Sequence, residues 1–182
     1  NPSPYLRKDF SLNGKISRAR LYISCHGLYH AEINGKRIGD QEFTPGWTSY
    51  DHRLQYQTYD VTNLLQERGN AMGIILGDGW FRGNLGWVDN RNIWGTRLSA
   101  IAQLQVWYED GSVEIIPTDP TWKAGTGPIL KSDIYNGETY DATLELAGWS
   151  TPGYDDGDWA GVEIMEISKG KLIAPEGPPV RI

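Results

Sequence analysis

Along much of the chain, apolar and polar residues alternate with a period of two, which is the pattern of a β-strand with one buried face. In the segment 19–25 the odd-numbered residues are all apolar, and the even-numbered ones are Arg20, Tyr22 and Ser24. This alternation predicts a strand over 19–25. Similar patterns predict further strands over 53–59, 71–76, 98–108, 113–117, 122–124, 138–142 and 162–167.

The pair Asn34-Gly35 predicts a tight hairpin between the segments 31–33 and 36–38. Both residue types accept the positive φ angles that a type I′ turn needs at its two central positions. A single helical turn is expected over 60–65, with Asp60 as its cap, and the sequence has no long amphipathic helix.

Many short strands, with no helices to connect parallel neighbours, favour antiparallel sheets packed face to face. The predicted fold class is therefore all-β, an antiparallel jelly-roll-like β-sandwich. We expect the sandwich to occupy residues 1–168. The segment 169–182 contains three prolines and is expected to be an extended exit toward a following domain.

Composition and charge narrow the possible partners. The 182 residues include 17 Lys and Arg against 23 Asp and Glu, which gives a formal net charge of -6. No overall positive field exists to attract phosphates, so we expect no nucleic-acid partner. The lone cysteine, Cys25, cannot form an intrachain disulfide, and with three histidines it provides no zinc-type cluster. No apolar run approaches about 18 residues, so no membrane partner is expected either.

Three connections are too long for simple hairpins: 39–52, 77–97 and 125–137. Long ordered loops on a sandwich commonly carry binding surfaces. The connection 77–97 contains three Trp, five Gly, two Asp and three Asn, a composition suited to sugars. Indole faces stack on the C–H face of a sugar ring, while amides and carboxylates bond to its hydroxyls. The alternative is that the tryptophans only cap the open end of the core.

Motifs for catalysis are weak. Glu138 and Asp141 are separated by an odd number of positions, so in a strand they point to opposite faces and make a poor catalytic pair. The acidic run 155–158 fits a turn better than a calcium-binding loop. The sequence contains no G-x-S-x-G elbow, phosphate loop or dinucleotide fingerprint.

Several segments in a characteristic order carry a resemblance to the amino-terminal β-sandwich domain of bacterial α-L-rhamnosidases. They are Leu6-Arg7-Lys8 with Phe10, Ile33-Asn34-Gly35-Lys36, Pro45-Gly46-Trp47-Thr48, the segment 56–62, Gly77-Asp78-Gly79-Trp80 with Arg82-Gly83, and the segment 135–142. Together they cover nearly the whole chain.

The resemblance implies a domain of a much longer glycoside hydrolase whose catalytic carboxylates lie on a separate (α/α)₆ barrel. This chain would then be non-catalytic, with L-rhamnose or a rhamnosylated glycan and the parent's catalytic domain as partners, in a periplasmic or extracellular setting. Some related domains bind L-rhamnose through calcium. The residues that we expect in such a pocket are Asp51, Trp80, Asn84, Asp89, Asn90 and Glu138.

Calcium is a possible cofactor, and Asp51, Asp89 and Glu138 are its candidate ligands. They lie on or beside three different long connections and would converge only if these loops gather at one end of the sandwich. The alternative is that these acids point into solvent or pair with nearby arginines, namely Arg53, Arg82 and Arg91.

Two functions other than sugar binding remain open. One is a small stand-alone glycosidase or lyase that uses Glu138 with Asp141 or Asp89. The other is a purely architectural domain whose Trp-rich loop is buried by neighbouring domains of the parent protein.

Overall fold

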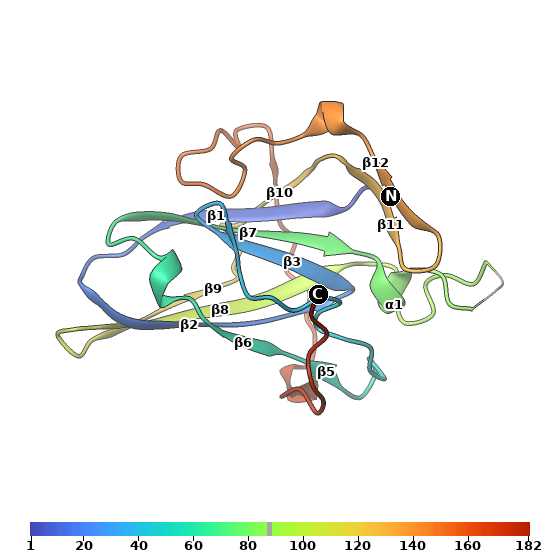
Figure 1. The fold of residues 1–182 in the computed structure, drawn as a ribbon, viewed down its shortest axis with the longest axis horizontal. Coiled ribbons are helices and arrows are strands. Elements are labelled where there is room, and N and C mark those ends of the chain that lie inside the picture. The colour runs from blue at the N-terminus through green and yellow to red at the C-terminus, as the bar shows by residue number, and fades with distance from the viewer. Residues whose placement is uncertain (87–88) are drawn as a thin grey trace.

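The computed structural model describes residues 1–86 and 89–182, and they form two packed antiparallel sheets (Figure 1). The order in the six-stranded sheet is β13 (Ala160–Gly161), β10 (Lys123–Thr126), β1 (Pro4–Ser11), β7 (Gly69–Gly77), β3 (Leu28–Ile33) and β4 (Lys36–Arg37). The order in the four-stranded sheet is β6 (Gln57–Asp60), β2 (Ile16–His26), β8 (Ser99–Tyr108) and β9 (Val113–Pro117). The predicted all-β sandwich is confirmed.

Smaller elements complete the fold. One hairpin pairs β11 (Ile129–Asp133) with β12 (Gly137–Tyr140), and a short parallel pair joins β5 (Leu54–Gln55) to β14 (Leu172–Ile173). The helical turns are η1 (Thr62–Leu64), α1 (Gly79–Arg82), η2 (Ala142–Leu144) and η3 (Lys169–Lys171). Among the described residues, no helix is long and apolar enough to cross a membrane.

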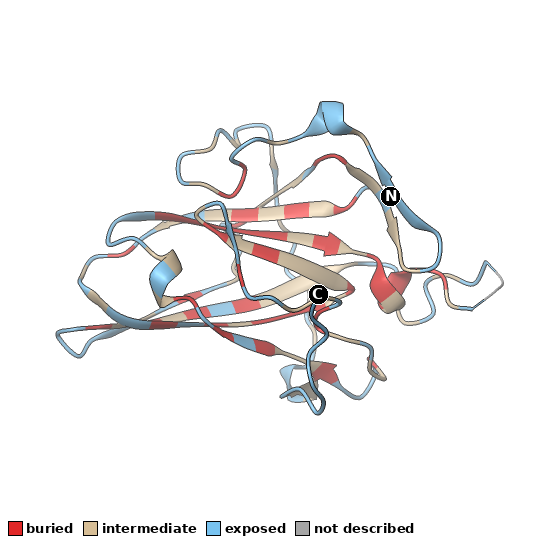
Figure 2. Cartoon of the chain, in the orientation of Figure 1, coloured by how far each residue is buried: buried red, intermediate tan, exposed pale blue. Residues whose placement is uncertain are grey.

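The core lies between the two sheets and follows the predicted alternation. Leu21 and Ile23 of β2 and Leu104 of β8 are fully buried there, against Ile74 and Leu76 of β7. Figure 2 shows buried residues alternating with less buried ones along much of β2 and β8, whereas β7 is buried almost throughout. A slip of one residue in either strand would turn the apolar set outward, so burial itself determines the register.

The predicted hairpin turn is confirmed, whereas the N-cap of η1 is Val61 and Asp60 lies one residue before it. Asn34 and Gly35 have φ angles of 52° and 76°, as a type I′ turn requires. The Asp60 carboxylate accepts a hydrogen bond of 3.0 Å from the backbone N–H of Thr62 at the start of η1.

The predicted strand over 162–167 is wrong. The last strand of this region, β13, ends at Gly161, and residues 162–168 have no regular structure. This segment leaves the sheet edge and crosses the side of the sandwich, where Val162 makes one backbone bond, to Trp122, at 3.4 Å. Val162, Met165 and Ile167 are half-buried while Ile164 is 53% exposed, and the segment has no neighbouring strand to pair with, so alternation alone was misleading.

The remaining differences concern the bounds of predicted strands and the elements that the sequence did not predict. The predicted strand 53–59 is divided at Tyr56 into β5 and β6, and the predicted strand 138–142 ends at Tyr140, where the chain turns into η2. Strands β1 and β11 and the turn α1 had no clear sequence signal. In β1 the alternation is hidden, because one of the buried positions is occupied by Arg7.

Arg7 lies on the outer side of β1 beneath the segment 149–156, and only 1% of its surface is exposed. Its guanidinium donates to the carbonyl oxygens of Trp149 at 2.9 Å and Thr151 at 3.2 Å. It also forms ion pairs with Asp9 and Asp156. A cation thus replaces apolar packing where this segment closes over the sheet.

The C-terminal segment folds back onto the sandwich. Leu172 pairs with Leu54 in the parallel β14–β5 ladder, and Val180 forms a bridge with Glu42. The boundary at residue 168 between the sandwich and an exit segment stays a prediction.

Candidate functional site

The long connections 39–52 and 77–97 meet at one end of the sandwich, beside the β11–β12 hairpin (Figure 1). Ring contacts join the first two connections, and a hydrogen-bonded side-chain pair joins the connection 77–97 to β11. The expected gathering of loops therefore occurs. It brings together side chains that are far apart in sequence.

Three aromatic residues form a surface cluster here, which we call the aromatic ledge: the exposed Phe43 and Trp47 and the half-buried Trp80. The Trp47 and Trp80 rings stack nearly in parallel, with centroids 5.7 Å apart and planes 8° apart, and Phe43 lies 6.0 Å from Trp80. Trp47 is 52% exposed and Phe43 48%. Large aromatic groups left this open to solvent indicate a binding surface rather than core packing.

A second, buried aromatic group supports the ledge from below. Tyr50 packs edge-on against Phe81 at 5.2 Å and against Trp94 at 5.6 Å, and His26 stacks on Phe81 at 4.4 Å. Burial, and then the positive charge of Lys171, lower the pKa of His26. This group anchors α1, so that Trp80 next to Phe81 is held at the rim.

An ion network fixes the path of the connection 77–97. The buried Asp78 carboxylate accepts a hydrogen bond of 2.7 Å from Nε of Arg82, one helical turn later, and also pairs with Arg91. Two arginines on one buried carboxylate tie both halves of this connection together. Both guanidinium groups are therefore occupied by Asp78.

Asn84 links the connection 77–97 to β11. Its backbone N–H and its Nδ2 both donate to Oδ2 of Asp133 at 2.9 Å. Burial alone would raise the pKa of Asp133, but hydrogen bonds from the N–H groups of Asn84, Asn136 and Tyr135 outweigh it and lower that pKa below its usual value. Within the described part of the chain, Oδ1 of Asn84 is buried without a hydrogen-bond partner.

The predicted site residues differ in burial and in location. Trp80 is at the rim, as expected, whereas Asn84 is buried and holds the loop. Asp51, Asp89, Asn90 and Glu138 are exposed. Part of the connection, residues 87–88 with Trp87, lies outside the described residues.

The expected convergence of Asp51, Asp89 and Glu138 is wrong. Among the described residues, no group of three or more His, Cys, Asp or Glu side chains is arranged to hold a metal ion. The loops meet through their aromatic and amide groups, while these carboxylates remain at exposed positions, where water solvates them separately. The residues present therefore do not fit a calcium site built on these three acids.

The alternative was that these three acids point into solvent or pair with nearby arginines. The acids are exposed, and the arginines suggested for them pair with other residues. Arg82 and Arg91 pair with Asp78, and Arg53 pairs with Glu176 of the C-terminal segment. A buried carboxylate close in space attracts a guanidinium more strongly than a solvated one close in sequence.

The sequence predicted a long connection over 39–52 but did not identify Trp47 and Phe43 as neighbours of Trp80. The Pro45-Gly46 turn before Trp47 was the available signal, since it predicts a loop that exposes the next side chain. Phe43 had no such signal. Its contact with Trp80 depends on how the two connections cross.

Comparison with known proteins identifies the family. A family model described as the α-L-rhamnosidase N-terminal domain matches residues 14–182. The chain belongs to this family. The resemblance noted from the sequence is thereby confirmed, and the match covers both sheets of the sandwich except for β1.

Individual relatives agree with this assignment. An α-L-rhamnosidase of Streptomyces avermitilis is 44% identical over 97% of this rhamnosidase domain, which spans 17% of that protein's length. The crystal structure of native α-L-rhamnosidase from Aspergillus terreus has a TM-score of 0.97 at 45% identity, covering 100% of this chain and 21% of that one. The structure of the Streptomyces avermitilis enzyme complexed with L-rhamnose has a TM-score of 0.95 at 43% identity, covering 100% and 18%.

Proposed function

We propose that this chain serves an α-L-rhamnosidase as a non-catalytic accessory domain and binds L-rhamnose or a rhamnosylated glycan at the aromatic ledge. The observation that carries the proposal is the exposed Trp47, stacked in parallel on the half-buried Trp80 at the loop end of the sandwich. In a stacked pair the inner faces cover each other, so the outer face of the exposed Trp47 is the flat apolar surface that a sugar ring can cover with its C–H face. Asp51, Asp89 and Asn90 are exposed on the same two connections and supply groups for sugar hydroxyls.

The relatives support the accessory part of this proposal. The chain spans about a fifth of the relatives named above, whose names describe α-L-rhamnosidases. The remaining four-fifths of such a protein would supply catalysis, and its catalytic domain would be the partner of this one. The relative complexed with L-rhamnose supports the choice of sugar.

Replacing Trp80 with alanine is expected to weaken binding of L-rhamnose by about 1–3 kcal/mol, because the change removes half of the stacked pair. Isothermal titration of the chain with L-rhamnose measures this, once with millimolar calcium and once with chelator. The matched control is Trp107→Ala, because Trp107 lies in β8 under the Arg18 guanidinium, away from the ledge. Unchanged affinity in a folded Trp80→Ala chain would exclude the ledge as the sugar site.

We expect the chain alone to release no sugar from aryl α-L-rhamnosides. A catalytic acid needs a raised pKa, which burial commonly provides. Asp141 is instead a cap of η2, and hydrogen bonds from the hydroxyl and N–H groups of Thr143 lower its pKa. Glu138 is exposed on β12. Turnover above background that is lost in Glu138→Gln would contradict the accessory role and favour a stand-alone glycosidase.

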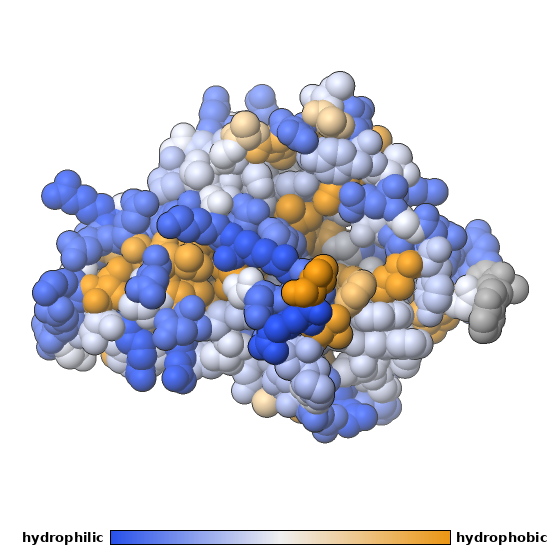
Figure 3. Space-filling model, viewed as in Figure 1, coloured by the Kyte–Doolittle hydropathy of each residue, from blue (hydrophilic) through white to orange (hydrophobic). Residues whose placement is uncertain are grey.

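One observation favours the architectural alternative. The backbone N–H of Glu42, next to Phe43, donates to Val180 O at 2.9 Å, so the C-terminal segment lies beside the ledge. Figure 3 shows apolar atoms exposed near this C-terminal end on a largely hydrophilic face. If rhamnose fails to bind, the ledge is better explained as a surface that packs against another domain of the parent enzyme.

A further inference from the structure

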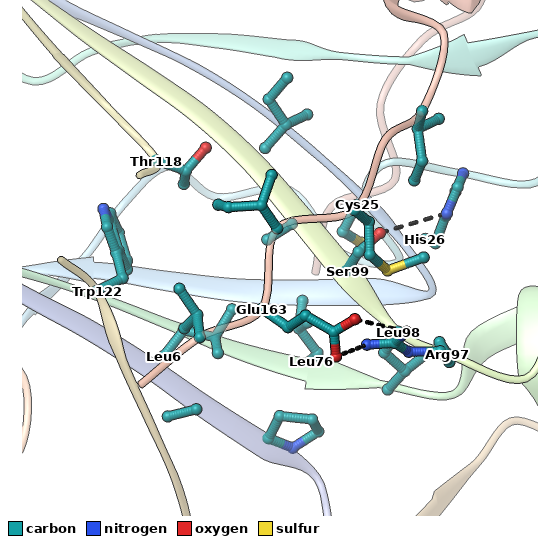
Figure 4. A pocket seen from close by; sticks show the side chains of 18 of the residues that line it. Leu6, Cys25, His26, Leu76, Arg97, Leu98, Ser99, Thr118, Trp122 and Glu163 are labelled. Atoms are coloured by element: carbon teal, nitrogen blue, oxygen red, sulfur yellow. Dashed lines mark hydrogen bonds and ion pairs between the residues drawn. The ribbon is translucent and has the colours of Figure 1, made fainter. Parts of the chain in front are cut away.

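A cavity of about 370 Å³ lies between the two sheets, beneath the segment 161–172, which we call the strap. Leu6 and Leu76 reach it from the six-stranded sheet, and Cys25 reaches it from the four-stranded sheet (Figure 4). Ala100 of the four-stranded sheet also lines it. Protein interiors are normally packed as densely as organic crystals, and a gap of this size leaves its lining without partner atoms. Its volume is in the range of about 300–1,000 Å³ that small-molecule sites occupy.

One end of the cavity is apolar and aromatic. Trp122 and Thr118 line it there, where the strap begins with the bond from Val162 to Trp122. Asp119 also lines this end, but its carboxylate is paired with Lys8 at 2.6 Å. This end therefore suits the uncharged part of a ligand.

The other end of the cavity is basic. Lys169 and Lys171 line it near His26, where the strap joins β5 through the pair Leu172–Leu54. The positive charge of Lys171 reaches the His26 ring. Among the described residues, the lysines that form ion pairs are Lys8, Lys15 and Lys123. Neither Lys169 nor Lys171 has such a partner there. Two unpaired ammonium groups on a chain with a net charge of -6 mark a local preference for an anion.

The strap closes the cavity with few bonds. Residues 162–168 have no regular structure, and the pair Arg97–Glu163, at 2.7 Å, holds their beginning to the residues just before β8. Both partners of this pair are exposed, and exposed ion pairs stabilise only weakly. A ligand can therefore enter by displacing residues 162–168 without breaking either sheet.

We propose that this cavity binds an anionic amphiphile, a medium-chain fatty carboxylate in its simplest form. The carboxylate lies at Lys169 and Lys171, and the alkyl chain extends toward Trp122 over an aliphatic lining. The site is distinct from the aromatic ledge and does not depend on rhamnose binding.

The test is a calorimetric titration of the chain with dodecanoate, below the concentration at which it forms micelles. We expect saturable binding that weakens about three- to tenfold in the double variant Lys169→Gln, Lys171→Gln, as expected for two partly exposed charges. The control Lys36→Gln changes an exposed lysine of β4 and should leave affinity unchanged. Dodecanol, which has no charge, should bind both forms equally. Absence of dodecanoate binding, or equal affinity in the double variant, would overturn the proposal.

Cys25 provides a second readout that needs no variant. It is the lone cysteine and is buried against the cavity, so its alkylation by N-ethylmaleimide, followed by mass spectrometry, reports access to that space. Saturating dodecanoate should slow the reaction severalfold. An unchanged rate would place the bound dodecanoate elsewhere and contradict the proposal. In Ala100→Phe, which fills the cavity, dodecanoate should no longer bind.

Discussion

Replacing Arg7 with methionine is expected to destabilise the chain by about 3–5 kcal/mol, as when one partner of a buried ion pair is removed. The substitution leaves the carbonyl oxygens of Trp149 and Thr151 without their donor and leaves the Asp156 carboxylate with Lys123 alone. Urea unfolding followed by tryptophan fluorescence measures the free energy of unfolding. The control Arg20→Met alters an exposed arginine of β2 and should change stability by less than about 0.5 kcal/mol.

The effect of Arg7→Met should depend on pH. Burial alone would raise the pKa of Asp156, but Lys123 and Arg7 outweigh it and lower that pKa below the unfolded value. A depressed carboxyl pKa stabilises the fold above the unfolded pKa of about 4, and this stabilisation is lost as the pH falls through the folded pKa. The difference between wild type and variant should therefore be largest near pH 7 and smaller at pH 3. An equal difference at both values would show that Arg7 acts by packing and not through its charge.

Gly27→Ala is expected to destabilise the chain by on the order of 3 kcal/mol, because strain and collision act together. Gly27 joins β2 to β3 with a φ of +119°, and an added Cβ would lie 2.4 Å from the carbonyl oxygen of Gly77 and 2.9 Å from the Leu98 side chain. The control is Gly111→Ala, where φ is +85° and nothing lies within 4 Å of the added Cβ. That variant has only the backbone strain, about 1–2 kcal/mol.

The comparison of these two alanine variants isolates the steric part. Thermal and urea unfolding of both, side by side, should show a larger loss for Gly27. Because Gly77 begins the connection that carries Trp80, the Gly27 variant should also change the near-ultraviolet circular dichroism of the stacked indoles. Equal losses in the free energy of unfolding at the two positions would mean that the backbone near Gly77 moves to accommodate the added methyl group at no cost in stability.

Several parts of the fold could be predicted because their causes are local. Strand β9 has the predicted bounds 113–117, and the Asn34-Gly35 turn has the predicted dihedral angles. Alternation identifies such strands because burial of one face needs nothing beyond the residue order. The segment 162–167 has a similar apolar content, but a strand also needs a partner with free backbone groups, and the sheet ends at β13 before this segment begins.

The candidate site was predictable in part. Trp80 could be placed at the rim because it follows a buried strand and lies between glycines. The stacking of Trp80 with Trp47 could not be predicted, because it depends on where the connections 39–52 and 77–97 cross in space. The ion pairs of Arg82 and Arg91 were assigned to the wrong acids for the same reason, since Asp78 becomes the best partner only once it is buried.

The sequence by itself determined the all-β class, the turn at Asn34-Gly35, the membership of the α-L-rhamnosidase N-terminal domain family and the position of Trp80 at a loop end. These follow from the period of burial, from backbone preferences and from segments in order along the chain. Only the tertiary structure decided that Trp47 and Trp80 stack, that Asp51, Asp89 and Glu138 stay apart, and that a cavity remains under the strap. Each of these depends on distances between segments remote in sequence, which are set by how the two sheets pack and where their connections cross.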